Sequence, residues 1–219
     1  MSEIIKLSVA LTVVCMLSGI VIVFTHSSTA KQIEAQKLRE QRSALEQLFP
    51  AGTRIVDTTG TAPLPSQYWI GRKETKTTGY AFAVENRGYS GIIRYIVGID
   101  TLGRITGMKI LSQTETPGLG TRMEEPVSGK SLWNAFGSGV HNDSHQWFTE
   151  QFKGISVKSP LSVSKSMEWP SLPDKIKTEF TASNTVSAIT GATVTTKAIV
   201  AGLEKTLPAF YAALRGTQR

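Results

Sequence analysis

The first feature of the chain is a long apolar run. Residues Leu7 to Thr25 read LSVALTVVCMLSGIVIVFT and carry no charged side chain. A helix rises about 1.5 Å per residue, so this run covers about 30 Å, the thickness of the hydrocarbon core of a bilayer. It predicts one transmembrane helix. A cleaved signal peptide is the alternative, because Lys6 precedes the run and small residues follow at 27–30, although a signal core is usually only about 7 to 15 residues long.

A different pattern begins at Lys31, where apolar residues recur near a helical period among Glu, Gln, Lys and Arg. The apolar positions are Ile33, Leu38, Leu45, Leu48 and Phe49. They predict a juxtamembrane helix that ends before Pro50. The chain therefore divides into a transmembrane anchor at 1–30, a juxtamembrane helix at 31–50 and a folded domain at 51–219.

Between Tyr68 and Ser112 the apolar period shortens toward two, which predicts strands. Apolar residues fall into two sets, with Tyr80, Phe82 and Val84 on one side and Ile93, Tyr95, Val97 and Ile99 on another. Turn residues at 86–88 and 100–104 separate the strands. The pattern predicts an antiparallel meander.

Helical patterns follow the strands. Short helices are plausible at Ser131–Phe136 and His145–Phe152, and a clearer one begins near Thr195. Pro208 interrupts that last helix and is expected to kink it or divide it in two. Its apolar positions recur at three and four residue steps, at Ile199, Leu203, Leu207, Phe210 and Leu214. Strands followed by packed helices predict an α+β domain.

Composition narrows the class of protein. The 219 residues are 40% hydrophobic and hold 24 Lys and Arg against 17 Asp and Glu, a net charge of +7. One cysteine, Cys15, excludes an internal disulfide, and three scattered histidines give no ordinary metal centre. The basic residues alternate with acidic ones and form no aromatic–basic stripe, so we expect no nucleic-acid partner.

Three motif matches fail on their spacing or context. Gly129-Lys130-Ser131 resembles the end of a P-loop, but Glu124 occupies the position of the earlier glycine. Gly118-Leu119-Gly120 begins like a dinucleotide fingerprint, but Met123 replaces the third glycine. The segment 141–145 holds two histidines and an aspartate, yet its glycine- and asparagine-rich surroundings predict a polar loop. We expect no metal ligands and no catalytic residues.

Two other segments carry candidate chemistry. The segment Thr114–Thr121 combines a carboxylate, hydroxyls and a Pro-Gly turn, and can either wrap a flat heterocycle or form an ordinary tight turn. The segment Thr190–Thr196 places small residues and hydroxyls at the start of a helix. Helix N-termini bind phosphate through free N–H groups and the helix dipole, and a simple threonine cap is the alternative.

These two segments resemble a known family. Thr190-Gly191-Ala192-Thr193 resembles the S/T-G-A-T flavinylation motif of FMN-binding domains, and the segment 115–120 is similar to their E-T-P-G-L-G segment. With the N-terminal span, the chain resembles the family of G subunits of Rnf electron-transport complexes. The C subunit of the sodium-translocating NADH:quinone oxidoreductase is a close relative of that family. The resemblance covers nearly the whole chain.

The resemblance implies a covalent flavin. Thr193 would carry FMN through a phosphoester bond, installed from FAD by a separate flavin transferase. One departure concerns recognition by that transferase, because Ser187 stands where such motifs commonly carry an acidic residue. The other residues implied are Thr190, Gly191, Ala192 and Thr195 at the phosphate end and Glu115, Thr116, Gly118 and Leu119 near the flavin.

The resemblance also implies a place and a role. The chain would carry electrons in a complex between reduced ferredoxin and NAD, coupled to ion movement, with other membrane and iron–sulfur subunits as partners. It would cross the cytoplasmic (inner) membrane once, with its FMN domain on the extracytoplasmic face. The Lys and Arg count, higher after the span than before it, favours the opposite orientation.

Other functions remain open. The homologous subunit of the quinone reductase shares the motif and the anchor, but that chain is usually longer. A cofactor-free anchored extracytoplasmic binding module is a second alternative, which absence of flavin would favour. A stand-alone flavin reductase is a third, and the missing nicotinamide fingerprint counts against it.

Overall fold

A computed structural model describes residues 2–60, 64–65, 67–125 and 146–217. The chain forms two compact units, Met1–Ser43 and Ala44–Arg219. The first unit consists of most of helix α1 (Ser2–Leu48), which continues without a break through residue 30. Its most apolar window has a mean hydropathy of 2.7, and none of that window is buried. The helix is therefore long and apolar enough to cross a membrane, as predicted.

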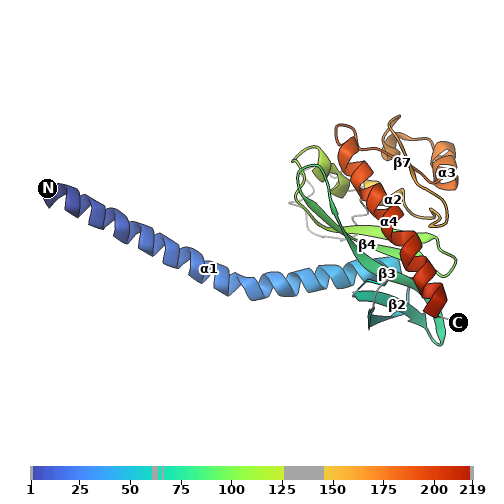
Figure 1. The fold of residues 1–219 in the computed structure, drawn as a ribbon, viewed down its shortest axis with the longest axis horizontal. Coiled ribbons are helices and arrows are strands. Elements are labelled where there is room, and N and C mark those ends of the chain that lie inside the picture. Colours follow the sequence, from blue (N-terminus) through green and yellow to red (C-terminus); the bar gives the residue numbers. More distant parts are fainter. Residues whose placement is uncertain (1, 61–63, 66, 126–145, 218–219) are drawn as a thin grey trace, which may run out of the picture. The chain divides into compact units, whose positions relative to one another are not determined.

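The second unit is built on a five-stranded antiparallel sheet in which each strand pairs with the next one in the chain (Figure 1). This is the predicted meander, preceded by one edge strand that the sequence did not predict, β1. The strands are β1 (Arg54–Thr59), β2 (Gln67–Lys73), β3 (Lys76–Arg87), β4 (Ile92–Asp100) and β5 (Ile105–Gln113).

One of the two predicted turns is confirmed. The turn after Asp100 joins β4 to β5, and the Asp100 carboxylate accepts the N–H groups of Leu102 at 2.9 Å and Arg104 at 2.8 Å. The turn predicted at 86–88 is misplaced by two residues, because residues 86 and 87 still pair with β4 and the chain reverses at 88–91. Gly88 N–H donates to the Gly91 carbonyl across this turn at 2.7 Å.

The two apolar sets of β3 and β4 lie on the same side of the sheet. Phe82 pairs directly with Val97, and the neighbouring positions pair in the same way. Residues directly opposite each other in an antiparallel pair share a face, so the prediction of separate sides is wrong. All seven residues belong to one core cluster.

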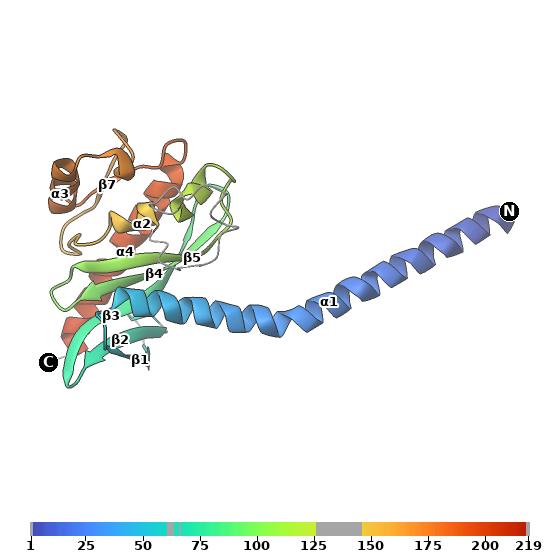
Figure 2. The ribbon, with the colours of Figure 1, turned by 180° about the vertical axis from the view of Figure 1, so that it is seen from behind.

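Helix α4 (Thr193–Thr217) covers this face of the sheet (Figure 1, Figure 2). It begins two residues before the predicted start. All five of its predicted apolar positions are buried in the core: Ile199, Leu203, Leu207, Phe210 and Leu214. Pro208 lies inside the helix and does not divide it.

Three residues fix α4 against the sheet. The Asn86 amide donates to the Ala198 carbonyl at 2.6 Å, and its oxygen lies 3.2 Å from the Tyr95 hydroxyl. That hydroxyl also lies 3.2 Å from the Ile199 carbonyl. Gly202 is required here because a Cβ would lie 1.7 Å from the Asn86 amide nitrogen. The start of α4 is thereby held at a defined place above β3 and β4.

The opposite face of the sheet has its own small core. Leu45, Leu48 and Phe49 pack there together with Trp69, Ala81 and Ile96. The compact second unit accordingly begins at Ala44, inside the segment predicted as a juxtamembrane helix. The helix ends before Pro50, as predicted.

Short elements fill the region between β5 and α4, including a parallel pair of β6 and β7. The prediction of a helix at 145–152 corresponds to the shorter α2, whereas the helix predicted at Ser131–Phe136 and the segments 129–131 and 141–145 lie outside the described residues. The elements are η1 (Gly120–Glu124), α2 (Trp147–Glu150), β6 (Ser162–Ser164), η3 (Trp169–Ser171), α3 (Asp174–Ala182) and β7 (Thr185–Ser187).

Candidate functional site

The two segments with candidate chemistry meet at one cavity beside the start of α4. Its volume is about 360 Å³, within the range of small-molecule sites. Of the predicted site residues, Gly118 and Thr190 are not among those that line it. The lining consists of Tyr89, Glu115, Thr116, Leu119, Gly120, Gly191, Ala192, Thr193, Val194 and Thr195. Residues about 75 positions apart in the sequence thus line one cavity.

The first turn of α4, residues 193–195, lines this cavity. Thr196 N–H donates to the Ala192 carbonyl at 3.1 Å, which is the first bond of the helix. The N–H groups of residues 193–195 belong to the first turn, which an α-helix leaves without acceptors of its own. Together with the helix dipole they favour an anion such as a phosphate. Thr193 is half-buried at this position.

Gly191 allows the chain to turn into the helix. Its φ is +80°, in the left-handed region that favours glycine. A Cβ at this position would lie 2.9 Å from a terminal methyl carbon of Leu119, which belongs to the other segment. A side chain at this position would therefore press on the other segment.

Glu115 connects the two segments beside the cavity. Its side chain is 6% exposed, and one carboxylate oxygen accepts the Thr195 hydroxyl at 2.6 Å. The other oxygen accepts the N–H groups of Ser90 at 3.1 Å and Gly91 at 3.4 Å. Both oxygens are thus engaged by protein donors. Glu115 holds three chain segments together, and its charge is compensated by three hydrogen bonds.

Two glycines make room for this carboxylate. A Cβ at Gly88 would lie 2.2 Å from one Glu115 oxygen, and a Cβ at Gly120 would lie 2.6 Å from the other. Gly120 belongs to the E-T-P-G-L-G segment. Gly88 was not predicted as a site residue, and the sequence signal for it was limited to its place in a turn between two strands.

Exposed apolar side chains surround the cavity. Tyr89 is 70% exposed, Val194 55% and Leu119 43%. Apolar groups beside a few backbone and hydroxyl donors are typical of a binding site for a ligand with an apolar part. Of the three, the sequence predicted only Leu119. A large aromatic side chain in a short turn was the available signal for Tyr89.

A second connection between the segments involves two residues that the sequence did not predict. The Arg122 guanidinium donates two hydrogen bonds to the Glu168 carboxylate, at 2.7 and 2.9 Å. The same carboxylate accepts the Thr190 N–H at 2.8 Å. Burial tends to raise the pKa of Glu168, but the hydrogen bonds from Arg122 and Thr190 outweigh this and hold the pKa below its ordinary value.

Ser187, which stands where the motif commonly carries an acidic residue, lies near Glu168 in the fold. Ser187 is fully buried, its N–H donates to the Gln151 side chain at 2.7 Å, and its carbonyl accepts from the same side chain at 3.2 Å. The Ser187 hydroxyl donates to the Met167 carbonyl. Ser187 is therefore a hydrogen-bonded core residue beside the segment that carries Glu168.

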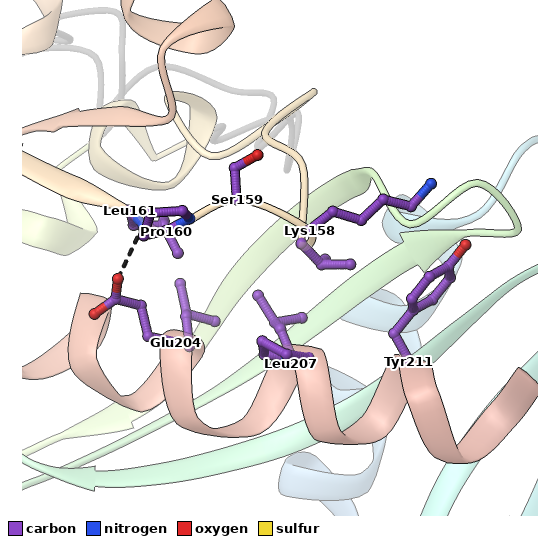
Figure 3. A pocket seen from close by; sticks show the side chains of 10 residues that line it. Lys158, Ser159, Pro160, Leu161, Glu204, Leu207 and Tyr211 are labelled. Carbon is purple, nitrogen blue, oxygen red and sulfur yellow. Dashed lines mark hydrogen bonds between the residues drawn. The ribbon is translucent and has the colours of Figure 1, made fainter.

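A separate cavity of about 450 Å³ lies further along α4 (Figure 3). Leu207 and Tyr211 line it from the helix, and the segment 157–161 lines it from the other side. Its carboxylate, Glu204, accepts the Leu161 N–H at 2.9 Å. Neither of the two predicted segments reaches this cavity.

The chemistry of the first cavity is that of a binding site. Among its described lining residues Glu115 is the one carboxylate, and protein donors already occupy both of its oxygens. The site offers first-turn N–H groups, a hydroxyl at Thr193 and an apolar edge. This arrangement suits a ligand that combines a phosphate with a flat apolar group.

Comparison with known proteins agrees with this arrangement. The FMN-binding domain family is matched over residues 88–208, and the RnfG N-terminal region is matched over residues 1–48.

Proteins of other organisms are similar over most of this chain. The G subunit of the Na⁺-translocating ferredoxin:NAD⁺ oxidoreductase complex of Acetobacterium woodii is 27% identical, covering 94% of this chain and 90% of its own. The G subunit of the proton-translocating complex of Clostridium ljungdahlii is 26% identical, covering 89% and 85%. Among solved structures, the C subunit of the Na⁺-translocating NADH-quinone reductase of Parabacteroides distasonis is 19% identical with a TM-score of 0.46, covering 78% and 81%.

Proposed function

This chain belongs to the FMN-binding domain family, and from that premise we propose that it is the electron-carrying subunit of a membrane-bound, ion-translocating ferredoxin:NAD oxidoreductase (Rnf) complex. The relatives named as G subunits of such complexes match it over most of both chains. The match of residues 1–48 to the RnfG N-terminal region favours this role over that of the quinone reductase subunit. The other membrane and iron–sulfur subunits of the complex are the expected partners.

The cofactor of this role is FMN bound covalently to Thr193. The observation that carries the proposal is the single cavity at which the threonine of one motif faces the loop of the other. The residues present fit the group: the first-turn N–H groups suit its phosphate, and Tyr89, Leu119 and Val194 suit its apolar ring system. Gly191 lets the backbone approach closely.

Attachment is a transfer from FAD catalysed by a flavin transferase. The Thr193 oxygen forms an ester bond to the phosphorus of the FMN half, the phosphoanhydride bond of FAD breaks, and AMP leaves. The hydroxyl proton is released in the same exchange. The chain contributes the position of the hydroxyl at the helix start, where the first-turn N–H groups stabilise the negative phosphate.

Bound FMN supplies reversible uptake and release of electrons. The chain itself would hold the phosphate end at 193–195 and the ring system beside its apolar side chains, and Glu115 and Thr195 fix the two loops. These contacts set the position and the surroundings of the flavin, and no independent substrate turnover is expected.

Replacement of the attachment hydroxyl tests this proposal. Thr193→Val keeps the shape of the side chain but lacks the hydroxyl, whereas Thr193→Ser keeps the hydroxyl and serves as the matched control. Each full-length chain is purified from host membranes, and the denatured band is examined for flavin fluorescence and intact mass. We expect wild type and Thr193→Ser to carry the mass of FMN less one water, and Thr193→Val to carry none. A wild-type chain without flavin would instead favour the cofactor-free binding module.

The domain is proposed to face the extracytoplasmic side of the membrane, against the weak Lys and Arg asymmetry around the span. The double variant Cys15→Ser, Lys158→Cys has a single thiol, which lies on the domain. A membrane-impermeant maleimide should label this thiol in intact cells. Labelling only after the cells are opened would contradict the proposed orientation.

A further inference from the structure

Glu168 lies outside both sequence motifs, yet its hydrogen bonds connect it to the segment that carries Thr193. We propose that Glu168 is a positioning residue for flavin attachment: by accepting the Thr190 N–H while paired with Arg122, it fixes the loop that presents Thr193. This inference rests on the proposed function, because it concerns the attachment of FMN at that site. It assigns a role to two residues outside both motifs.

The hydrogen bond to Thr190 restrains the loop close to the reacting residue. Thr190 is exposed, and its N–H lies 2.8 Å from the Glu168 carboxylate. It begins the four-residue motif that ends at Thr193. The next residue, Gly191, has the left-handed conformation, and α4 begins at Thr193. Fixing the Thr190 N–H therefore fixes one end of the turn that aims the Thr193 hydroxyl.

Arg122 fixes the carboxylate itself. Its two terminal nitrogens each donate to a different oxygen of Glu168, a bidentate arrangement that restricts rotation of both side chains. The Arg122 and Glu168 side chains are 27% and 19% exposed, so water competes less for them than at an open surface. Arg122 lies in η1, which begins at the last glycine of the E-T-P-G-L-G segment. The pair thus links the two motifs.

This link is the second of two that restrain the segment carrying Thr193. The first is the hydrogen bond from Thr195 to Glu115, after the attachment residue in the chain. The second is the bond from Thr190 to Glu168, before it. Thr193 lies between the two fixed points. Loss of either restraint increases the number of orientations that the Thr193 hydroxyl samples, which slows a reaction that needs one orientation.

The place of Glu168 in the fold also bears on Ser187. Ser187 is buried and hydrogen-bonded to the carbonyl of Met167, the residue before Glu168. The segment around 168 is thus held directly beside β7, and a carboxylate reaches the motif from there. An acidic residue at 187 is therefore not needed to bring a carboxylate to the Thr190 N–H.

The rate of flavin attachment tests the inference. The flavin-free full-length chain is incubated with FAD, magnesium and a flavin transferase, and the modified fraction is followed by intact mass. Glu168→Ala removes the acceptor and should slow attachment about tenfold, as expected for loss of one charge-assisted hydrogen bond. Glu168→Gln retains a neutral acceptor for the N–H and should restore part of the rate. Partial rescue by this variant is not expected of a residue that contributes only its ion pair.

The Arg94–Glu85 pair provides a matched control. Its contact is as short, at 2.6 Å, but both side chains are more than half exposed and neither lines the cavity. Glu85→Gln should leave the rate of attachment unchanged. Equal slowing by Glu85→Gln and Glu168→Ala would mean that loss of any carboxylate has this effect, and would overturn the inference.

Amide hydrogen exchange gives a readout that does not depend on flavin. In the flavin-free wild type the Thr190 amide should exchange slowly, and in Glu168→Ala it should exchange faster while the amides of β4 stay protected. That control also shows that the variant is folded. Unchanged exchange, or full-rate attachment in Glu168→Ala, would overturn the inference alone. A wild-type chain that accepts no FMN would refute the proposed function together with it.

Discussion

The two cavities along α4 differ in chemistry more than in size. The one at 203–211 has the larger volume, about 450 Å³, but it is lined by the middle of α4 and not by its start (Figure 3). Its one carboxylate, Glu204, is exposed and makes a single hydrogen bond to the backbone of Leu161. The one at 191–195 is smaller, about 360 Å³, and is lined by the first turn of α4 together with threonines and glycines.

The difference shows why volume is a poor guide to function. A binding site for a phosphate needs donors that protein groups have not already engaged, and the first turn of a helix provides them. The middle of α4 cannot, because each N–H there has an acceptor one turn earlier. Glu115 and Glu204 illustrate the same contrast, since the first is buried with three donors and the second is exposed with one.

The largest expected effect on stability lies at the cavity that we do not assign to FMN. Leu207 is 1% exposed, and Leu207→Ala should lower the free energy of unfolding by about 3 kcal/mol through lost burial and a new void. Flavin attachment per folded chain should stay unchanged. Urea unfolding and intact mass measure the two quantities. Loss of flavin at a temperature where the variant is folded would contradict the assignment of FMN to the cavity at 191–195 alone.

Replacement of Glu115 should lower stability by less than Leu207→Ala, but it should also reduce flavin attachment. Glu115→Ala leaves the Thr195 hydroxyl and the N–H groups of Ser90 and Gly91 without their acceptor, which should cost about 2 kcal/mol. Attachment should fall with it, because the loop loses a restraint. Glu204→Ala is the matched control and should change unfolding by less than about 1 kcal/mol, with attachment unaffected. Similar results for both variants would contradict the contrast.

Gly191→Ala tests whether the backbone conformation beside the cavity at 191–195 matters for flavin attachment. The left-handed φ of +80° should cost an alanine about 1 kcal/mol, and its Cβ would press on the end of the Leu119 side chain. The measurements are thermal unfolding and the rate of attachment, which should be slower. Gly52→Ala is the matched control, with a φ of +78° and open space around its Cβ. It should show the same strain without slower attachment, and equal slowing in both would refute a local role for Gly191.

The smallest effect concerns pH. The depressed pKa of Glu168 means that its ion pair stabilises the fold above the ordinary value of 4.5, and that this contribution is lost as the pH falls through the depressed folded value. The difference in unfolding free energy between wild type and Glu168→Gln should therefore be constant above about pH 5 and shrink below it. Urea unfolding across this range checks the sign. A difference that grows on acidification would contradict it.

Much of the framework could be predicted from local patterns. The apolar run, the alternating strands and the apolar positions of α4 each depend on a period that neighbouring residues reveal. The strands β6 and β7 are three residues long and pair in parallel, with α3 between them in the chain, so no local periodicity predicts them. The turn before β4 was misplaced because Asn86 and Arg87 have turn-forming composition but pair within the sheet.

The site was predictable where it lies in contiguous motifs. Both loops of the cavity were found in this way, and their meeting at one place required the fold. Arg122, Glu168 and Tyr89 were missed because each acts through a contact between distant segments or through exposure alone. A single sequence holds no signal for a carboxylate that reaches a backbone N–H from 22 residues away.

The most direct test of the central claim is tandem mass spectrometry of the tryptic peptide 178–197 from the native membrane protein. This peptide contains all the hydroxyls of the attachment loop, including Thr190, Thr193, Thr195 and Thr196. The account predicts fragment ions that place FMN, less one water, on Thr193. An unmodified peptide, or fragments that place the flavin on another hydroxyl, would contradict it.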